Sequence, residues 1–218
     1  MSFDTLAPFY TWMEHLSAGG KLQRCRTAYL ESVPEPRHIL TLGEGHGPFL
    51  AACRARFPQA HIVVAEGSAR MIQQARRRLA KARLDSPLVE LVHIDIFAWT
   101  PPPAAFDLIA THFFLDCFTK EQIEGLIPRI ASSATPQATW LLADFQEARQ
   151  GWRRTRSRAI LAIMYLFFRI VTRLPAHRLA DPDPHLQRAG FQLRERRTYD
   201  WDLLKSDCWV RGDACVIP

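Results

Sequence analysis

Short apolar runs separated by amphipathic segments dominate the first two thirds of the chain. The runs begin at His38, His61, Val92, Phe106 and Trp140. Strands that are buried on both faces are continuously apolar, so this alternation predicts βα units and a parallel sheet. Polar and apolar residues alternate over 191–199 and 206–212. The tail therefore predicts two more strands, which would form an antiparallel hairpin at the sheet edge.

Helices are predicted between these strands from periodicity and from residues that begin or end helices. Segment 69–82 is amphipathic and very basic, and Thr119 is a candidate N-cap for a helix that ends at Ser132. Gly190 follows a short predicted helix at 185–189. Residues 4–30 are also predicted to be helical, with an interruption at two glycines.

A glycine-rich turn follows the first apolar run. Gly43, Gly45 and Gly47 alternate with Glu44 and a histidine, directly before a helix-compatible segment. Such a turn brings backbone N–H groups and a helix N-terminus close to a ligand, with no Cβ in the way. The second apolar run ends at an acid, Glu66, where doubly wound nucleotide sites bind ribose hydroxyls. This order favours a nucleoside-containing cofactor.

The spacing of the turn separates two kinds of nucleoside cofactor. A dinucleotide fingerprint has its third glycine three positions after the second, but Gly47 comes two positions after Gly45. The carboxylate of Glu44 inside the turn would repel a pyrophosphate and would tolerate an ammonium or sulfonium group.

This turn resembles the first motif of the class I S-adenosylmethionine-dependent methyltransferases. The resemblance continues, in the family's order, through roughly residues 37–145. The further matching segments are Glu66-Gly67-Ser68-Ala69-Arg70-Met71, Val92-His93-Ile94-Asp95-Ile96-Phe97, Phe106-Asp107-Leu108-Ile109-Ala110-Thr111-His112-Phe113 and Trp140-Leu141-Leu142-Ala143-Asp144-Phe145.

The resemblance implies an α/β fold of the Rossmann-like methyltransferase type. Its doubly wound, seven-stranded sheet is mostly parallel with one antiparallel strand, and helices cover both faces. We expect one domain over 1–218, with a helical lid at 1–33 and a helical cap at about 149–180. S-adenosyl-L-methionine is the implied cofactor. Its implied contacts are Gly43, Glu44, Gly45, Gly47, Glu66, Gly67, Met71, Asp95, Ile96, Phe97 and Thr111.

His112 is the preferred candidate for a catalytic base, because in similar enzymes its position faces the methyl group. A histidine is close to neutral at cytoplasmic pH and can accept a proton. An equal alternative is a half-buried histidine that bonds a carbonyl or packs on the cofactor. Asp144 is a weaker candidate, since it could instead cap a helix or pair with arginine.

Two apolar regions are candidate acceptor walls. One is the aromatic N-terminal segment with Tyr10 and Trp12, whose alternative role is a core-facing helix side. The other is segment 149–178, which has eight arginines, no Asp or Glu, and a central apolar run too short to span a bilayer. It could roof a pocket, lie in a membrane interface or pack against a second subunit. The candidate acceptor contacts are Tyr10, Trp12, Phe113, Phe114, Met164 and Phe167.

Composition agrees with one globular domain. The chain has 218 residues, of which 48% are hydrophobic and 23% charged, and its net charge is +6. Five dispersed cysteines indicate reduced thiols and no metal cluster. With no targeting segment recognised, we expect a cytoplasmic protein, either free or peripheral to the inner membrane face.

These observations predict methyl transfer to oxygen or nitrogen of a small, largely apolar or aromatic acceptor. Methyl transfer to a lipid or isoprenoid at the membrane surface, and a non-catalytic cofactor-binding module, remain alternatives. A homodimer is compatible with the sequence. A nucleic-acid acceptor is not expected, because Thr111-His112-Phe113-Phe114 stands where base-methylating enzymes have Asn/Asp-Pro-Pro-aromatic.

Overall fold

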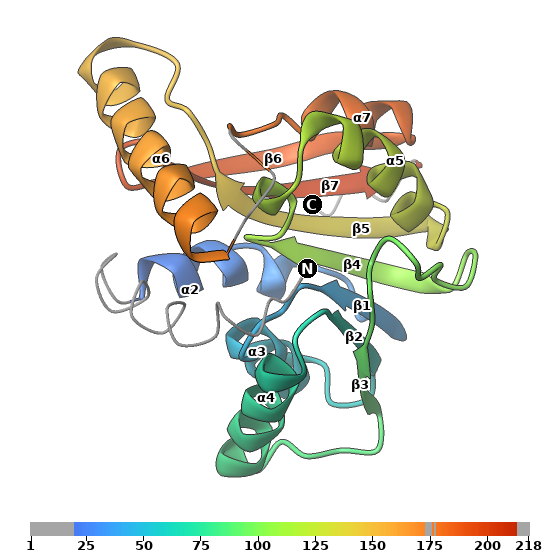
Figure 1. Cartoon of the computed structure of the whole chain (residues 1–218). Coiled ribbons are helices and arrows are strands. Elements are labelled where there is room, and N and C mark those ends of the chain that lie inside the picture. The colour runs from blue at the N-terminus through green and yellow to red at the C-terminus, as the bar shows by residue number, and fades with distance from the viewer. Residues whose placement is uncertain (1–19, 173–175, 177, 213–218) are drawn as a thin grey trace.

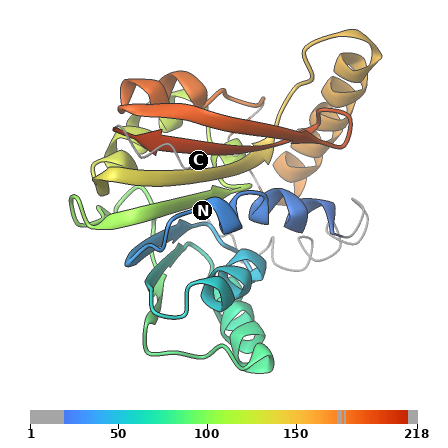
Figure 2. The same ribbon diagram turned by 180° about the vertical axis from the view of Figure 1, so that it is seen from behind.

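The computed structural model describes residues 20–172, 176 and 178–212. Seven strands form one sheet in the order β3-β2-β1-β4-β5-β7-β6, with helices on both faces (Figures 1 and 2). The strands are β1 (His38–Leu42), β2 (His61–Glu66), β3 (Val89–His93), β4 (Phe106–His112), β5 (Ala134–Phe145), β6 (Phe191–Tyr199) and β7 (Leu204–Arg211). β7 runs antiparallel to both of its neighbours, β5 and β6, and all the other neighbouring strands pair in parallel. The predicted fold class is confirmed.

The strand order reverses between β1 and β4, which pair in parallel. From this switch point the chain winds outward in both directions, so the loops after the two strands diverge. A crevice consequently opens at their carboxyl ends, where open α/β sheets bind ligands. β1 and β4 are almost wholly buried, as their continuous apolar sequences predict.

Each face of the sheet has its own hydrophobic core. One face is covered by α3 (Pro48–Arg56), α4 (Ala69–Ala82) and the 3-10 turn η2 (Leu30–Ser32), with Phe49 and Phe57 fully buried. The other is covered by α5 (Lys120–Ala131) and α7 (Asp183–Arg188), which pack around Trp140 and Phe191. A two-sided core explains why the central strands have no polar face.

The predicted helix signals agree closely with the structure. α4 has the predicted bounds, and the side chain of Ser68 caps it by accepting from the Met71 N–H (3.2 Å). Thr119 caps α5 in a reciprocal capping box with Gln122. Gly190 has φ +86° directly after α7 and its C-cap residue, as a helix-ending glycine should.

The arginine-rich insertion forms one helix, α6 (Gly151–Thr172), at the edge of the molecule (Figure 1). The predicted lid lies mostly outside the described residues. Its described part is α2 (Lys21–Thr27) and η2, and α2 packs through Cys25 against Phe113 and Leu204. The lid and cap roles of these segments stay predictions.

A buried ionic cluster joins the hairpin of β6 and β7 to α7. The Arg196 guanidinium donates to both carboxylate oxygens of Asp207 (2.6 and 2.7 Å) and to Asp183 (2.8 Å). Lys205 Nζ lies 2.9 Å from Asp183 and 3.4 Å from Asp207. Asp207 is fully buried, so its charge depends on these partners.

We predict that Asp207→Ala lowers the free energy of unfolding by about 3–5 kcal/mol, because two cations lose a buried partner. Urea unfolding measures the change. Glu195→Ala is the matched control, since its ion pair with Arg197 is half exposed and should contribute at most about 1 kcal/mol. Equal losses in the two variants would contradict the prediction.

Candidate cofactor and acceptor site

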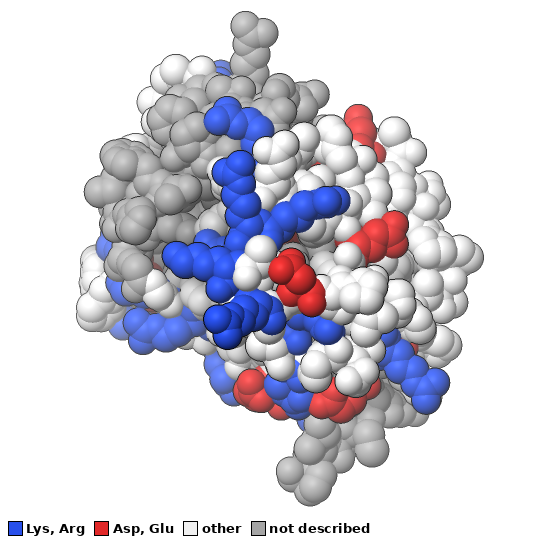
Figure 3. All heavy atoms as spheres, turned by 90° about the horizontal axis from the view of Figure 1, so that it is seen from below, with Lys and Arg blue, Asp and Glu red and all other residues white. Residues whose placement is uncertain are grey.

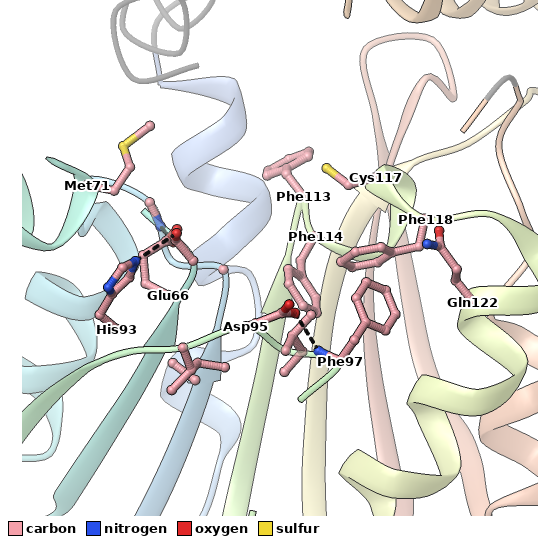
Figure 4. Close-up of a pocket in the computed structure, with 16 residues that line it drawn as sticks. Glu66, Met71, His93, Asp95, Phe97, Phe113, Phe114, Cys117, Phe118 and Gln122 are labelled. Carbon is pink, nitrogen blue, oxygen red and sulfur yellow. Dashed lines mark hydrogen bonds between the residues drawn. The ribbon is translucent and has the colours of Figure 1, made fainter. Parts of the chain in front are cut away.

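A cavity of about 420 Å³ opens at the carboxyl ends of the parallel strands. Its size is that of a site for one small ligand. Acidic side chains from the ends of β2 and β3 face aromatic side chains from the β4–α5 connection across it (Figure 4). The lining residues are Gly43, Gly45, Ala65, Glu66, Gly67, Met71, His93, Ile94, Asp95, Ile96, Phe97, Phe113, Phe114, Cys117, Phe118 and Gln122.

Two glycines of the turn after β1 form the cavity floor. Gly43 and Gly45 both have φ +64°, a backbone conformation that residues with a Cβ rarely adopt. A Cβ on Gly43 would overlap the ring of Phe114, whereas a Cβ on Gly45 would meet only Met71 Sδ at 4.0 Å. The first glycine is therefore required for packing, and the second leaves backbone accessible to a ligand.

The Glu66 carboxylate is fixed at the end of β2. Its Oε2 accepts from the Gly45 N–H and its Oε1 from the Ser68 N–H, both at 2.9 Å. Burial raises the pKa of Glu66, while these backbone donors favour the charged form. Each oxygen keeps a further lone pair, so the carboxylate can also accept two ligand hydroxyls.

The loop after β3 is held in place from the far side. Asp95 Oδ1 accepts from the Phe97 N–H (2.9 Å; Figure 4), and the Arg129 guanidinium donates to the carbonyls of Ile96 (2.6 Å) and Phe97 (2.8 Å). This loop presents Asp95, Ile96 and Phe97 to the cavity. A carboxylate can accept from an amino group, and apolar side chains can pack on a flat heterocycle.

Aromatic rings form the opposite wall. Phe118 packs edge-on against Phe97 and Phe114, with ring centroids 5.3 and 5.0 Å apart. Phe113 has φ +53°, a strained conformation for a non-glycine residue, and its ring lies 5.0 Å from the Arg26 guanidinium. This backbone conformation turns the chain sharply at the end of β4, and both Phe113 and Phe114 line the cavity.

Three predicted cofactor contacts do not line the cavity. Glu44 is buried, and its Oε1 accepts from the N–H groups of Phe49 and Leu50 (2.8 and 2.9 Å) at the start of α3. Gly47 lets α3 approach α4, since a Cβ there would lie 3.0 Å from that of Ala75. Thr111 Oγ1 accepts from Trp140 Nε1 (2.8 Å). In the structure these three residues therefore stabilise the turn after β1 and the contacts between its neighbouring elements, and they do not line the cavity.

His112 also lies behind the cavity wall. Its ring packs edge-on against Phe49, with centroids 4.3 Å apart, and its Nδ1 is buried with no hydrogen-bond partner among the described residues. Burial, assisted by the charge of Arg26, lowers the pKa of His112 to about 3. Such a group is a weak proton acceptor near pH 7, so this placement gives no support to His112 as the base.

Asp144 lies beneath the 3-10 turn η3 (Leu115–Cys117) and does not line the cavity. Its Oδ2 accepts from the Asp116 N–H (3.2 Å) and its Oδ1 from the Phe145 N–H (2.9 Å). Burial and the nearby Asp116 carboxylate raise the pKa of Asp144 well above its ordinary value. The structure shows Asp144 fixing η3 to the end of β5.

The predicted acceptor contacts divide into three groups. Phe113 and Phe114 line the cavity. Met164 and Phe167 belong to the cluster between α6 and η3, which also includes Cys117. Tyr10 and Trp12 lie outside the described residues.

The comparisons with known proteins agree with this geometry. Residues 39–137 match a family model described as a methyltransferase domain. A trans-aconitate 2-methyltransferase of Paracidovorax citrulli is 36% identical over 100 residues, which are 45% of this chain and 35% of that protein. Together with the sheet topology, these matches indicate a class I S-adenosylmethionine-dependent methyltransferase. The matched segment spans about a third of the length of this curated relative.

Solved methyltransferase structures share the fold over almost the whole chain. Mitomycin 7-O-methyltransferase superposes with a TM-score of 0.67 at 16% identity, covering 97% of this chain and 61% of that one. A 1,6-didemethyltoxoflavin-N1-methyltransferase of Burkholderia thailandensis gives 0.63 at 13% identity, covering 95% and 87%. At such low identities the likeness shows the fold alone.

Several cavity residues of this methyltransferase domain were not predicted from the sequence. Ala65, Ile94 and His93 lie in or directly beside predicted strand ends, so their positions followed from the same signal. Cys117, Phe118 and Gln122 come from η3 and the first turn of α5. Gln122 lies in the first turn of the helix that Thr119 begins, and no sequence signal indicates that this helix start faces the site.

We predict that His112→Leu removes an acid-sensitive contribution to stability. The folded-state pKa lies below the unfolded value, so the native protein loses stability as the pH falls from about 6.5 toward 3. Between pH 7 and pH 5 the wild type should lose about 2 kcal/mol more than the variant. Urea unfolding of both proteins at the two pH values measures this difference, and parallel losses would contradict it.

Proposed function

We propose that the protein transfers a methyl group from S-adenosylmethionine to oxygen or nitrogen of a small, largely apolar or aromatic acceptor. The observation that carries the proposal is the Glu66 carboxylate, which is held by two backbone N–H groups at the cavity wall beside the open Gly45. A fixed carboxylate between a glycine turn and a strand end suits a ribose diol.

The lining residues fit the adenosine part of the cofactor. Glu66 would accept from both ribose hydroxyls, and Asp95 would accept from the adenine amino group while Ile96 packs on the ring. Phe97, Phe114 and Phe118 would exclude water around the adenine ring. When bound, S-adenosylmethionine supplies a methyl group that is already activated on a sulfonium.

The protein's remaining task is to align the acceptor. Of the titratable residues that line the cavity in the described part of the chain, Glu66 and Asp95 are assigned to the cofactor. His93 Nε2 contacts the Gly67 carbonyl (3.1 Å) on the ribose side. Burial raises the pKa of the Cys117 thiol well above its ordinary value, so the thiol stays protonated. We infer that the acceptor presents an atom that is already unprotonated, such as a carboxylate or phenolate oxygen.

Glu66→Ala should weaken S-adenosylmethionine binding at least tenfold, or about 1.4 kcal/mol, because the ribose hydroxyls lose their acceptor. Isothermal titration calorimetry measures the affinity. Glu90→Ala, on the neighbouring strand β3 and exposed, is the matched control and should bind normally. Unchanged affinity in Glu66→Ala would overturn the cofactor assignment.

A screen with methyl-labelled cofactor against carboxylates, phenols, amines and thiols tests the acceptor. We expect label on a carboxylate or phenol, with a rate that rises through the pKa of the acceptor used. A rate that follows one enzyme pKa for every acceptor would contradict an unprotonated acceptor. Tight cofactor binding with no transfer to any class would favour a non-catalytic binding module.

A lipid or isoprenoid acceptor at a membrane surface is the second candidate. One observation favours it: the outer side of α6 is apolar and exposed, and its inner side packs against η3, which contributes Cys117 to the cavity wall.

A further inference from the structure

Helix α6 has two apolar sides, and only one of them is covered. Its inner side packs through Leu161, Tyr165 and Phe168 against η3, the end of β5, and the β6–β7 and α6–α7 connections. On the other side Trp152, Ile163, Leu166 and Ile170 are 60%, 69%, 56% and 75% exposed. These are four of the seven large hydrophobic side chains that are exposed in the described part of the chain, so the exposure is concentrated on this helix.

The four side chains lie on one side of the helix, which we call the outer face of α6. Their spacings of 11, 3 and 4 residues place them within about 60° of one another around the helix, at about 100° per residue. Eighteen residues at about 1.5 Å each give the face a length of about 27 Å. Trp201 extends it, because its ring contacts that of Trp152 in a tilted arrangement (centroids 5.4 Å apart) and the residue is 56% exposed.

All charged side chains of α6 itself are positive. α6 contains five arginines and no Asp or Glu. Arg153, Arg154 and Arg156 form ion pairs with Asp202, Glu147 and Asp200, which anchor the N-terminal half of the helix to the body. Arg158 lies 3.9 Å from Glu147 and is 64% exposed, and Arg169 forms no ion pair with a described residue. At about 100° per residue, both lie beyond the same edge of the outer face, about 60–80° around the helix from Leu166.

This combination matches a helix that lies in a membrane interface. Apolar side chains enter the acyl boundary, arginines extend to anionic headgroups, and tryptophans prefer the interfacial depth. In the part of the chain that the structure describes, no helix is long and apolar enough to cross the bilayer. A second copy on the same face would instead bring two arginine-rich helices together with no acid in either to offset their charge.

We propose that the outer face of α6 docks the protein on an anionic membrane surface. Docking would bring the cavity close to the bilayer, because the Tyr165 hydroxyl on the inner side of the helix donates to the Asp116 carbonyl (3.0 Å) and the next residue, Cys117, lines the cavity. The docking does not depend on methyl transfer, so the two proposals can fail separately.

Co-sedimentation of the full chain with vesicles tests the proposal. The vesicles contain equal amounts of phosphatidylglycerol and phosphatidylcholine, or phosphatidylcholine alone. We expect binding to the anionic vesicles that weakens with salt, and a loss of about tenfold or more in the triple variant Ile163→Ser/Leu166→Ser/Ile170→Ser. Leu193→Ser, at an exposed position on β6, is the apolar control and should bind like the wild type.

A second pair of variants separates this face from the basic surface of α4. Arg76, Arg77, Lys81 and Arg83 are exposed there, and Figure 3 shows Lys and Arg side chains gathered on that side of the molecule. Arg158→Gln/Arg169→Gln should weaken vesicle binding, and Arg77→Gln/Lys81→Gln should leave it unchanged. The reverse result would overturn the proposal, because α4 would then be the docking surface.

Two further outcomes would also overturn it. One is no vesicle binding by the wild type. The other is a dimer, seen by sedimentation velocity, that the triple serine variant converts to a monomer, since a second copy would then cover the face. Circular dichroism and S-adenosylhomocysteine binding by the triple variant show that it is folded, so that a loss of vesicle binding reports on the outer face.

Discussion

The Glu66 carboxylate ties together the three segments from which the site is built. It accepts from the Gly45 N–H in the turn after β1 and from the Ser68 N–H at the start of α4, while Glu66 itself ends β2. These bonds satisfy two donors that would otherwise be unpaired in a loop and at a helix N-terminus. The Glu66 side chain therefore both sets the shape of the turn and presents the carboxylate that would bind the ligand. The position of this carboxylate depends on β1, which leads into the turn, and on β2, which ends at Glu66.

Strand patterns and the glycine turn predict this much of the site, because each depends on local sequence. Parallel strands bring their carboxyl ends to one edge, so Glu66 and Asp95 follow from the order of the runs. The roles of Glu44 and Gly47 do not follow in this way. Both stand in the turn, but the carboxylate of Glu44 points to the start of α3, and Gly47 is needed by the contact with Ala75. Spacing locates a turn and leaves the direction of its side chains open.

The same limit applies to His112, the candidate base. Its position at the end of β4 predicts a place near the ligand, but successive residues of a strand point to opposite faces. In the structure, His112 is buried against Phe49 of α3. The next residue, Phe113, has a positive φ, and Phe113 and Phe114 both line the cavity. A positive φ at a phenylalanine has no local sequence signal. It depends on the surrounding tertiary packing, in which the ring of Phe114 lies close to Gly43.

Tertiary packing also decides what the arginine-rich insertion can do. From the sequence, its apolar run was compatible with a pocket roof, a membrane contact or a subunit interface. The structure divides the run between two sides of α6. Tyr165 and Leu161 are buried beside η3, whereas Ile163 and Leu166 are exposed. Adjacent residues of one apolar run thus serve different surfaces. A roof over the acceptor end and a membrane contact then no longer compete, because a helix with a covered inner side and an exposed outer side can provide both.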